Sequence, residues 1–549
     1  MRVTAANVDG HGDRGDRGLG GRDLGGVVPE LQDRTQKEIR LFDTLSGGVK
    51  PLVPSHPGLV RMYTCGPTVY NFTHIGHLRP ALVGDVLARH LERRGYRVLW
   101  VSNFTDIDDR IIARAAEQGV SATTFADRYI ADYLHNLALL GIDRIERFAR
   151  VTEHIPDILE MVSTLVERGY AYAVEGDVYF SVTAKRDYGK LSGRSLDDMQ
   201  AGARIAVDPR KRHPMDFALW KAAKPQEPHW ESPWGPGRPG WHIECSAMSL
   251  RYLGDGFDIH GGGGDLIFPH HENEIAQSEA FMGTEPFVHI WLHNAMVEVE
   301  GEKISKSQGN FVPLRDLVRQ YTPGVLRQFV LSTHYRKPLQ YSDAALRETQ
   351  RAWNRLRSAR QAWESVLGGV VPPGEPAPVQ METVDSVAAD AAPTPVAAAA
   401  AGLEQAAAAA DDAFRAALDD DLNTAGALGV LFDLVRRGNG AVAAAPAGAL
   451  PRGLASALSV LRRCGDTLGL WEGAGVGPVV AAGDDPARSS ALVELLLQVR
   501  ADARAYRDFA MADRIRAALA AAGVQVEDTP QGTRWVWGGA PDAPAVAKL

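Results

Sequence analysis

Residues 65–77 read CGPTVYNFTHIGH and connect a predicted strand, Val60–Cys65, to a predicted helix, Arg79–Arg94. The helix is expected because one of its faces would carry Val83, Val86, Leu87, His90 and Leu91. A second strand is expected at Arg97–Val101. A strand, a helix and a strand within about 40 residues are typical of a parallel βαβ unit. The stretch therefore predicts a doubly wound α/β domain with a parallel sheet.

The end of this stretch, His74-Ile75-Gly76-His77, has the composition of a phosphate site. Open parallel sheets bind ligands at the carboxyl ends of their strands, and a helix N-terminus there favours anions. The two histidines add donors for a polyphosphate, and Gly76 allows a ligand ring to approach the backbone. A lone His-x-x-His is more often a pair of structural histidines. Its position at a strand-to-helix junction favours ligand binding instead.

A second basic motif is Lys303-Ile304-Ser305-Lys306-Ser307, which lies between Gly301 and Gly309. Two cations and two hydroxyls between glycines could form a mobile clamp for an anion. On its own, such a motif is more often a charged surface loop. A phosphate-binding P-loop is excluded, because Gly261–Gly264 is followed by Asp265 and not by lysine.

Residues of zinc-binding type are dispersed along the chain. They are Cys65, Cys245, His270 and Glu274. His270 and Glu274 are four residues apart, so one helix face would present both. The spacing alone leaves His271 and Glu272 as alternatives, because no compact Cys-x-x-Cys pair is present.

The chain as a whole has the composition of a soluble, multidomain protein. It has 549 residues, of which 45% are hydrophobic and 23% charged, so we expect about two to four domains. Three cysteines do not make a disulfide framework. No long apolar segment or signal peptide is found, so we expect no membrane association and a cytoplasmic location. The net charge of −9 neither favours nor excludes nucleic acid.

The two basic motifs together resemble the paired signatures of class I aminoacyl-tRNA synthetases, with Ile304 in place of methionine. With the four candidate zinc ligands, the resemblance narrows to the cysteinyl-tRNA synthetase family, in which the corresponding Cys, Cys, His and Glu bind zinc. It covers residues 38–365, 411–470 and 492–537. Stretches that fit include NFTDIDD at 103–109 and DIHGGG at 258–263.

The resemblance implies a Rossmann-like, doubly wound catalytic domain with an insertion, then a helical bundle and a small anticodon-binding domain. The expected boundaries are a disordered tail at 1–36, the catalytic domain at 37–340 with the insertion at about 120–230, a connecting helix at 341–367, an Ala/Pro-rich linker at 368–410, the bundle at 411–476, a linker at 477–489, the anticodon domain at 490–537 and a tail at 538–549.

The resemblance also implies the chemistry and the partners. L-Cysteine would be activated by ATP with Mg²⁺ and transferred to tRNA(Cys), with one Zn²⁺ per chain bound by the four candidates, and we expect a monomer. Expected catalytic residues are His74, His77, Lys303 and Lys306. Gly76 and Lys306 would bind the nucleotide. Near the amino acid we expect Gly66, Thr105, Trp241, His260 and Asp265, although core packing would also account for Trp241.

Two other functions fit parts of the sequence. The mycothiol-pathway cysteine ligase forms the same adenylate and joins cysteine to an amino sugar, but it lacks a full anticodon module. Residues 419–424 (DDDLNT) and 527–535 (EDTPQGTRW) match the synthetase instead. A catalytically silent RNA-binding relative is disfavoured by the intact motifs at 74–77 and 303–307.

Overall fold

The computed structural model describes residues 38–201, 208–225, 227–299, 302–303, 312–368, 395–446 and 449–471, together with parts of 493–537. The chain divides into two compact units, Met1–Gly475 and Val476–Leu549. The predicted tails at 1–36 and 538–549 and the predicted linker at 477–489 lie outside the described residues. No helix in the described ranges is long and apolar enough to span a bilayer.

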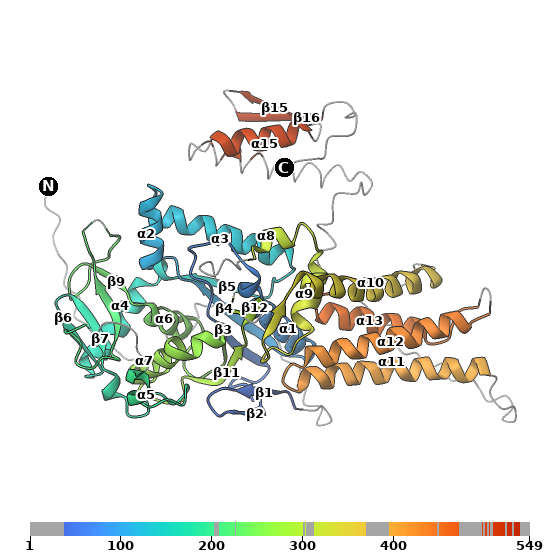
Figure 1. The fold of residues 1–549 in the computed structure, drawn as a ribbon, viewed down its shortest axis with the longest axis horizontal. Helices are drawn as coiled ribbons and strands as arrows, with labels where there is room; N and C mark the ends of the chain where they lie inside the picture. The colour runs from blue at the N-terminus through green and yellow to red at the C-terminus, as the bar shows by residue number, and fades with distance from the viewer. Residues whose placement is uncertain are drawn as a thin grey trace, which may run out of the picture. The chain divides into compact units, whose positions relative to one another are not determined.

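The first unit is built on a five-stranded parallel sheet in the order β11–β10–β3–β4–β5 (Figure 1). Its strands are β3 (Leu59–Thr64), β4 (Arg97–Phe104), β5 (Arg147–Arg150), β10 (Phe257–Gly263) and β11 (Val288–Asn294). The chain runs from β3 outward to β5, then returns to β10 on the other side of β3. Open α/β sheets bind ligands beside such a reversal of strand order. The predicted doubly wound sheet is confirmed.

Helices α1 (Ile75–Arg93) and α6 (Trp241–Leu253) cover opposite faces of this sheet. A Cβ on Gly84 of α1 would lie 2.7 Å from the Trp100 ring, so Trp100 faces α1. Thr105, at the end of β4, instead donates a hydrogen bond to Glu244 of α6. Successive side chains of a strand alternate between faces, so the even and odd positions of β4 serve different helices.

Helix α1 begins four residues earlier than the predicted start at Arg79. The N-cap is His74, whose side chain accepts a hydrogen bond from the Gly76 amide. Caps are usually Ser, Thr, Asp or Asn, so the sequence carried no ordinary start signal here. Pro80 within the helix also favours a later start in sequence-based reasoning.

The crossover from β4 to β5 contains α2 (Asp109–Glu117) and α3 (Ala122–Leu139). Because β5 pairs in parallel with β4, these helices belong to the sheet domain and not to the insertion. The start predicted at about residue 120 is therefore too early. The reason is that β5 has only four residues, which is too short to be recognised in the sequence as a sheet strand.

The insertion is an antiparallel sheet in the order β6–β7–β8–β9. It comprises η1 (Val151–Glu153), α4 (Ile155–Glu167), β6 (Ala171–Val174), β7 (Asp177–Phe180), η2 (Val182–Ala184), α5 (Leu196–Ala201), β8 (Phe217–Ala222) and β9 (Gly237–Pro239). The chain then returns to the parallel sheet through α6, which carries part of the candidate site.

Shorter elements surround the sheet. They are β1 (Arg40–Asp43), β2 (Gly48–Pro51), η3 (Gly264–Leu266), η4 (Ile267–His271), α7 (Glu272–Met282), β12 (Val297–Val299), β13 (Glu302–Lys303), α8 (Leu314–Leu317), α9 (Pro323–Leu331) and β14 (Leu339–Tyr341). Strands β13, β12 and β14 form a separate three-stranded sheet. This small sheet leads into and out of the segment that carries the second basic motif.

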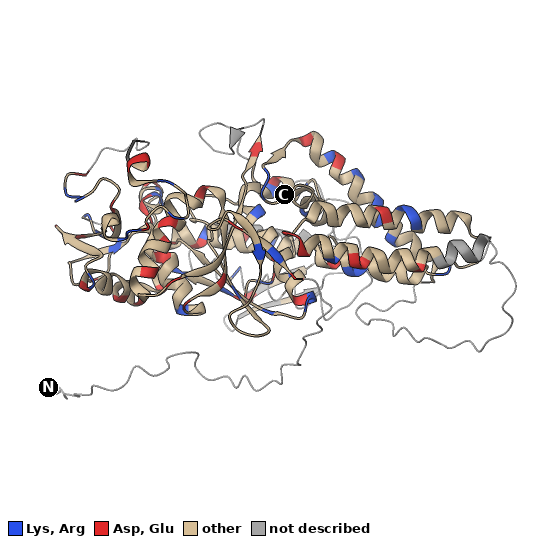
Figure 2. Cartoon of the chain, turned by 90° about the horizontal axis from the view of Figure 1, so that it is seen from below, with Lys and Arg blue, Asp and Glu red and all other residues tan. Residues whose placement is uncertain are grey.

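Four long helices follow: α10 (Asp343–Val366), α11 (Pro395–Asp419), α12 (Thr424–Ala444) and α13 (Leu454–Thr467). Figure 2 shows Lys and Arg mixed with Asp and Glu along this bundle. The prediction of a linker as far as residue 410 is wrong, because α11 is helical from residue 395. Alanine is the strongest helix former, and Leu403 and Ala407, four residues apart, are 3% and 1% exposed.

The bundle is anchored to α1 by buried polar contacts. His90 Nε2 lies 2.8 Å from Asp419 Oδ1, and Arg93 donates to Asp411 at 2.5 Å. Asp421 accepts from the Phe42 amide at 2.8 Å and from Tyr335 at 2.5 Å. Asp411, Asp419 and Asp421 therefore connect the bundle to the catalytic domain.

The second unit contains α15 (Phe509–Ala521) and the hairpin of β15 (Val524–Thr529) and β16 (Gly532–Trp537). The strands predicted around Val524 and Trp535 are confirmed, and Val526 pairs with Trp535. Its core includes Val493, Leu519 and Val524, with Trp535 partly buried against it.

Candidate active site

A cavity of about 690 Å³ opens at the carboxyl ends of β3, β4 and β10, beside the reversal of strand order. Its lining includes many of the residues predicted from the sequence: Cys65, Gly66, His74, Gly76, His77, Thr105, Trp241, Cys245, Asp265 and His270. The fold thus brings the histidine motif and three of the zinc-type residues into one cleft.

The two histidines of the first motif lie together at the N-terminus of α1. Their rings stack with centroids 3.7 Å apart, and His74 Nδ1 accepts from the Gly76 amide at 3.0 Å. Burial and the neighbouring His74 hold the pKa of His77 well below its usual range, so His77 is neutral near pH 7. A Cβ on Gly76 would lie 2.8 Å from the His74 ring, so this glycine also preserves the ring position.

The four predicted zinc-type residues converge from separate elements. Cys65 follows β3, Cys245 lies on α6, His270 lies in η4, and Glu274 lies on α7. Their potential ligand atoms all lie within 4.8 Å of one another. The two sulfur atoms are 3.5 Å apart, and His270 Nε2 is 3.0 Å from Glu274 Oε1. A soft thiol pair with an imidazole and a carboxylate fits a zinc ion.

Two members of the cluster, Cys245 and Glu274, ionise readily. Burial raises the pKa of the Cys245 thiol, but the hydrogen bond from Cys65 and the interaction with His270 outweigh burial and bring it to about 6. Burial also opposes ionisation of Glu274, yet the neighbouring histidines hold its pKa well below the usual range. A thiolate and a carboxylate are the forms that bind zinc. Burial raises the pKa of the Cys65 thiol well above its usual range, and for His270 burial is outweighed by Glu274 and Cys245, which raise its pKa to about 10.

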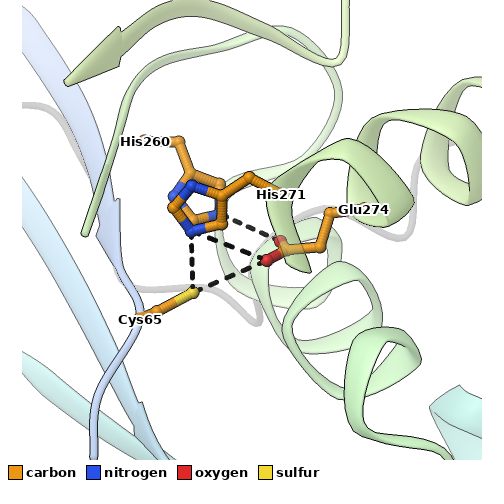
Figure 3. A group of neighbouring side chains, drawn as sticks. All are labelled: Cys65, His260, His271 and Glu274. Carbon is orange, nitrogen blue, oxygen red and sulfur yellow. Dashed lines mark hydrogen bonds and ion pairs between the residues drawn. The ribbon is translucent and has the colours of Figure 1, made fainter. Parts of the chain in front are cut away.

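A second, overlapping group also satisfies the distance condition. Figure 3 shows Cys65, His260, His271 and Glu274, whose ligand atoms likewise lie within 4.8 Å of one another. His271 Nε2 is 3.3 Å from the Cys65 sulfur, but its Nδ1 is 2.7 Å from His293. Neither His260 nor His271 lines the cleft. A catalytic zinc keeps a position open to substrate, which favours the group that includes Cys245 and His270.

Glu272, the other alternative from the sequence, points elsewhere. Its carboxylate accepts from the backbone amides of Gly189 at 3.0 Å and Ser192 at 2.7 Å. It therefore fixes the loop between η2 and α5 and is not part of either candidate zinc group.

His260 differs from its predicted position in the amino-acid pocket. It is fully buried, its Nε2 lies 2.9 Å from Glu274 Oε2, and its ring stacks on Trp291. It therefore orients the Glu274 carboxylate through this contact and does not line the cleft. Such a role depends on a partner 14 residues away, which a sequence pattern does not reveal.

Trp241 and Asp265 do line the cleft. Trp241 is 38% exposed, and its ring stacks on His270 at a centroid distance of 4.3 Å. The interpretation of Trp241 as a core residue is therefore wrong. Asp265 lies in the short turn η3, between the glycines of β10 and the turn that carries His270.

The prediction from the sequence missed two buried residues, Glu244 and Asn103, that hold predicted site residues in place. Thr105 Oγ1 donates to Glu244 Oε2 at 2.8 Å, and Glu244 is 1% exposed. Burial raises the pKa of the Glu244 carboxyl well above its usual range. The Gly66 amide donates to Asn103 Oδ1 at 2.9 Å, and a Cβ on Gly66 would lie 1.7 Å from the Asn103 carbonyl oxygen. Glycine is therefore required at position 66.

Arg79 is a further residue that sequence patterns did not single out. It is 1% exposed and donates to the carbonyl oxygens of Ala295 and Met296 at 2.7 and 3.0 Å. It also donates to those of His334 and Lys337 at 3.0 and 2.5 Å. Arg79 thereby fixes the cleft wall just before β12.

The second basic motif is only partly described. Lys303 lies in β13, where its backbone pairs with Glu298 of β12. Lys306 lies outside the described residues. The chain therefore enters the motif from a strand that borders the cleft wall held by Arg79.

Comparisons with known proteins agree with this architecture. Residues 51–351 match the model of the class I (C) tRNA synthetase catalytic domain, 413–472 match the DALR domain, and 489–535 match the cysteinyl-tRNA ligase anticodon binding domain. A cysteine–tRNA ligase of Pelotomaculum thermopropionicum is 47% identical over 90% of this chain and 99% of its own length. The chain belongs to the cysteine–tRNA ligase family. A relative from Heliobacterium modesticaldum is 46% identical over the same shares.

Solved structures share the fold at low identity. Mycobacterium tuberculosis methionyl-tRNA synthetase in complex with methionyl-adenylate has a TM-score of 0.56 at 16% identity, covering 76% of this chain and 92% of that one. A putative arginyl-tRNA synthetase from Campylobacter jejuni has a TM-score of 0.51 at 14% identity, covering 75% and 92%. The sequence relatives that match over 90% of this chain are cysteine–tRNA ligases, and residues 489–535 match the anticodon binding domain of that family.

Proposed function

We propose that this enzyme activates L-cysteine with ATP and Mg²⁺ and transfers the cysteinyl group to the 3′ end of tRNA(Cys). The observation that carries the proposal is the convergence of Cys65, Cys245 and His270 on the same cleft as His74 and His77. The first three residues could bind a metal that recognises a thiol, and the two histidines could bind phosphates. Both groups in one cavity suit a reaction between cysteine and ATP. We further propose a monomer that acts in the cytoplasm.

In the first step, the cysteine carboxylate attacks the α-phosphate of ATP and pyrophosphate leaves. His74 and His77 lie at a helix N-terminus, where N–H groups and the helix dipole favour the phosphates. We assign Lys303 and Lys306 to the pyrophosphate side, where charge develops as the bond breaks. Positioning and charge stabilisation of this kind need no covalent help from the protein.

In the second step, a ribose hydroxyl of the terminal adenosine of the tRNA attacks the acyl carbon, and AMP leaves. Gly66, Thr105, Trp241 and Asp265 are proposed to hold the amino acid in place during both steps. Thr105 is suited to this because its hydroxyl donates a hydrogen bond to Glu244, which leaves the lone pairs of Oγ1 available to the substrate ammonium.

We propose that one zinc ion per chain is held by Cys65, Cys245, His270 and Glu274. When bound there, zinc supplies a soft Lewis acid that binds the thiolate of cysteine in preference to the hydroxyl of serine. Shape alone separates such closely similar substrates by only about 1–3 kcal/mol. Trp241 packs on the His270 ring and would limit the rotation of that ligand.

We assign catalysis to residues 37–340 and anticodon recognition to 490–537, within the compact unit Val476–Leu549. Deleting residues 476–549 is therefore expected to leave cysteine-dependent ATP–pyrophosphate exchange within about twofold of the full chain. Aminoacylation of tRNA(Cys) should fall severely, mainly because more tRNA is required. RNA bases are read in unstacked loops, and the deletion removes the domain assigned to that task.

Both activities should be measured on the full chain and the truncated chain in parallel. Unchanged charging of tRNA(Cys) by the truncated chain would contradict the assignment of the anticodon domain. Failure of the full chain to support exchange with cysteine would contradict the proposed function itself.

A further inference from the structure

Asn103 lies near the end of β4, next to the cluster of thiols. It is 1% exposed, yet it contributes to the lining of the cleft. Its Oδ1 accepts a hydrogen bond from the Gly66 amide at 2.9 Å, and the Cys245 sulfur lies 3.7 Å from the same oxygen. The side chain is thus fixed at the corner of the cleft where the two cysteines meet.

The orientation of this amide follows from its contacts. A backbone N–H can donate only to the oxygen of the amide, so Oδ1 must face Gly66 and the NH₂ group must point away from it. Among the described residues, Asn103 Nδ2 has no hydrogen-bond partner. A buried donor left unpaired costs about 1–3 kcal/mol, so a fixed amide of this kind is suited to a ligand.

The position of the donor indicates which part of a ligand it would meet. Asn103 and Thr105 are two residues apart, so both side chains point to the face covered by α6. Thr105 contacts Glu244, and Asn103 lies beside Cys245, the next residue of that helix. The Asn103 side chain therefore lies at the end of the cleft where the sulfur-binding residues gather.

We infer that Asn103 reads the side chain of the substrate, donating a hydrogen bond from Nδ2 to the sulfur of the bound cysteine thiolate. The inference rests on the proposed function and adds a specificity residue to it. Thiolates at metal sites accept N–H hydrogen bonds, which tune the sulfur. An amino acid without this sulfur, such as alanine, leaves the buried donor unpaired and is penalised for that reason.

Asn103→Asp separates this role from a purely structural one. Aspartate keeps an oxygen for the Gly66 amide and almost the same size, but it replaces the donor NH₂ with a second oxygen. We expect cysteine binding without ATP to weaken about 10-fold or more, as the loss of a buried hydrogen bond to a charged group implies. Cysteamine has the thiol and the ammonium but no carboxylate, and its binding should weaken by the same factor.

Zinc content and the KM for ATP should stay at the values of the unsubstituted enzyme. Asn103→Ala provides a second variant without a new charge, and it should also weaken both ligands. Asn136→Asp is a matched control, because Asn136 is another buried amide on α3 that does not line the cleft. This control should bind cysteine normally.

Three results would overturn the inference. Loss of cysteine binding with normal cysteamine binding would assign the donor to the carboxylate, and normal binding of both would reduce Asn103 to a support for Gly66. Loss of zinc from both Asn103 variants would show that they act through the metal site. If the unsubstituted enzyme itself binds no cysteine, the proposed function fails first, and this outcome is distinguishable from the others.

Discussion

Replacing Cys245 with alanine is expected to remove bound zinc and cysteine activation together. Cys245 is 2% exposed, and its sulfur lies 3.5 Å from that of Cys65, so alanine would leave the buried site without one of its two sulfur ligands. The loss of activation should exceed the roughly 10–100-fold typical of residues that only support a metal ligand. Zinc content is measured by elemental analysis, and activation by cysteine-dependent ATP–pyrophosphate exchange.

Cys464→Ala is the matched control for this substitution. Cys464 is also buried, but it lies in the bundle beside Arg93 and takes no part in the cleft. This variant should keep about one zinc per chain and full activation. The Cys245 result also separates the two overlapping groups of ligands, because the group with His260 and His271 does not use Cys245. Full zinc occupancy in Cys245→Ala would therefore disprove the ligand assignment.

Lys306→Ala is expected to slow adenylate formation by about 10²–10³-fold, the cost typical of losing one group that stabilises developing charge. The effect on ATP binding should be much smaller, because negative charge accumulates on the leaving pyrophosphate mainly in the transition state. Single-turnover rates at saturating ATP, together with the dissociation constant for ATP, separate the two effects.

The control for Lys306 is Lys224→Ala, since the Lys224 side chain is 77% exposed and does not line the cleft. It removes one positive charge and should leave both quantities unchanged. An equal loss of rate and of ATP affinity in Lys306→Ala would contradict the account, because that pattern indicates uniform binding of ground state and transition state.

Much of the catalytic fold could be predicted because its signals are local. The apolar residues around 65–77 repeat with the spacing of a strand and then of a helix. The zinc-type residues that the structure brings together were indicated by the family resemblance. The start of α1 was missed because a histidine serves as its cap. The length of α11 was missed because an alanine-rich stretch has the composition of a linker as well as of a helix.

The residues that support the site were harder to predict, because their partners lie far away in the sequence. Glu244 meets Thr105 across 139 positions, and Arg79 binds carbonyl groups more than 200 positions away. A glutamate or an arginine on a helix is usually solvated, so the sequence favours that simpler interpretation. Asn103 becomes informative only when its contact with Gly66 shows which way the amide points.

The central claim is that cysteine activated in this cleft is delivered to tRNA. The most direct test is to incubate the full chain with ATP, labelled cysteine and either tRNA(Cys) or an amino-sugar acceptor, and to follow the label. The account predicts cysteine esterified to the 3′ end of tRNA(Cys), none on the amino sugar, and no comparable charging with serine. Label on the amino sugar, with none on tRNA(Cys), would contradict it.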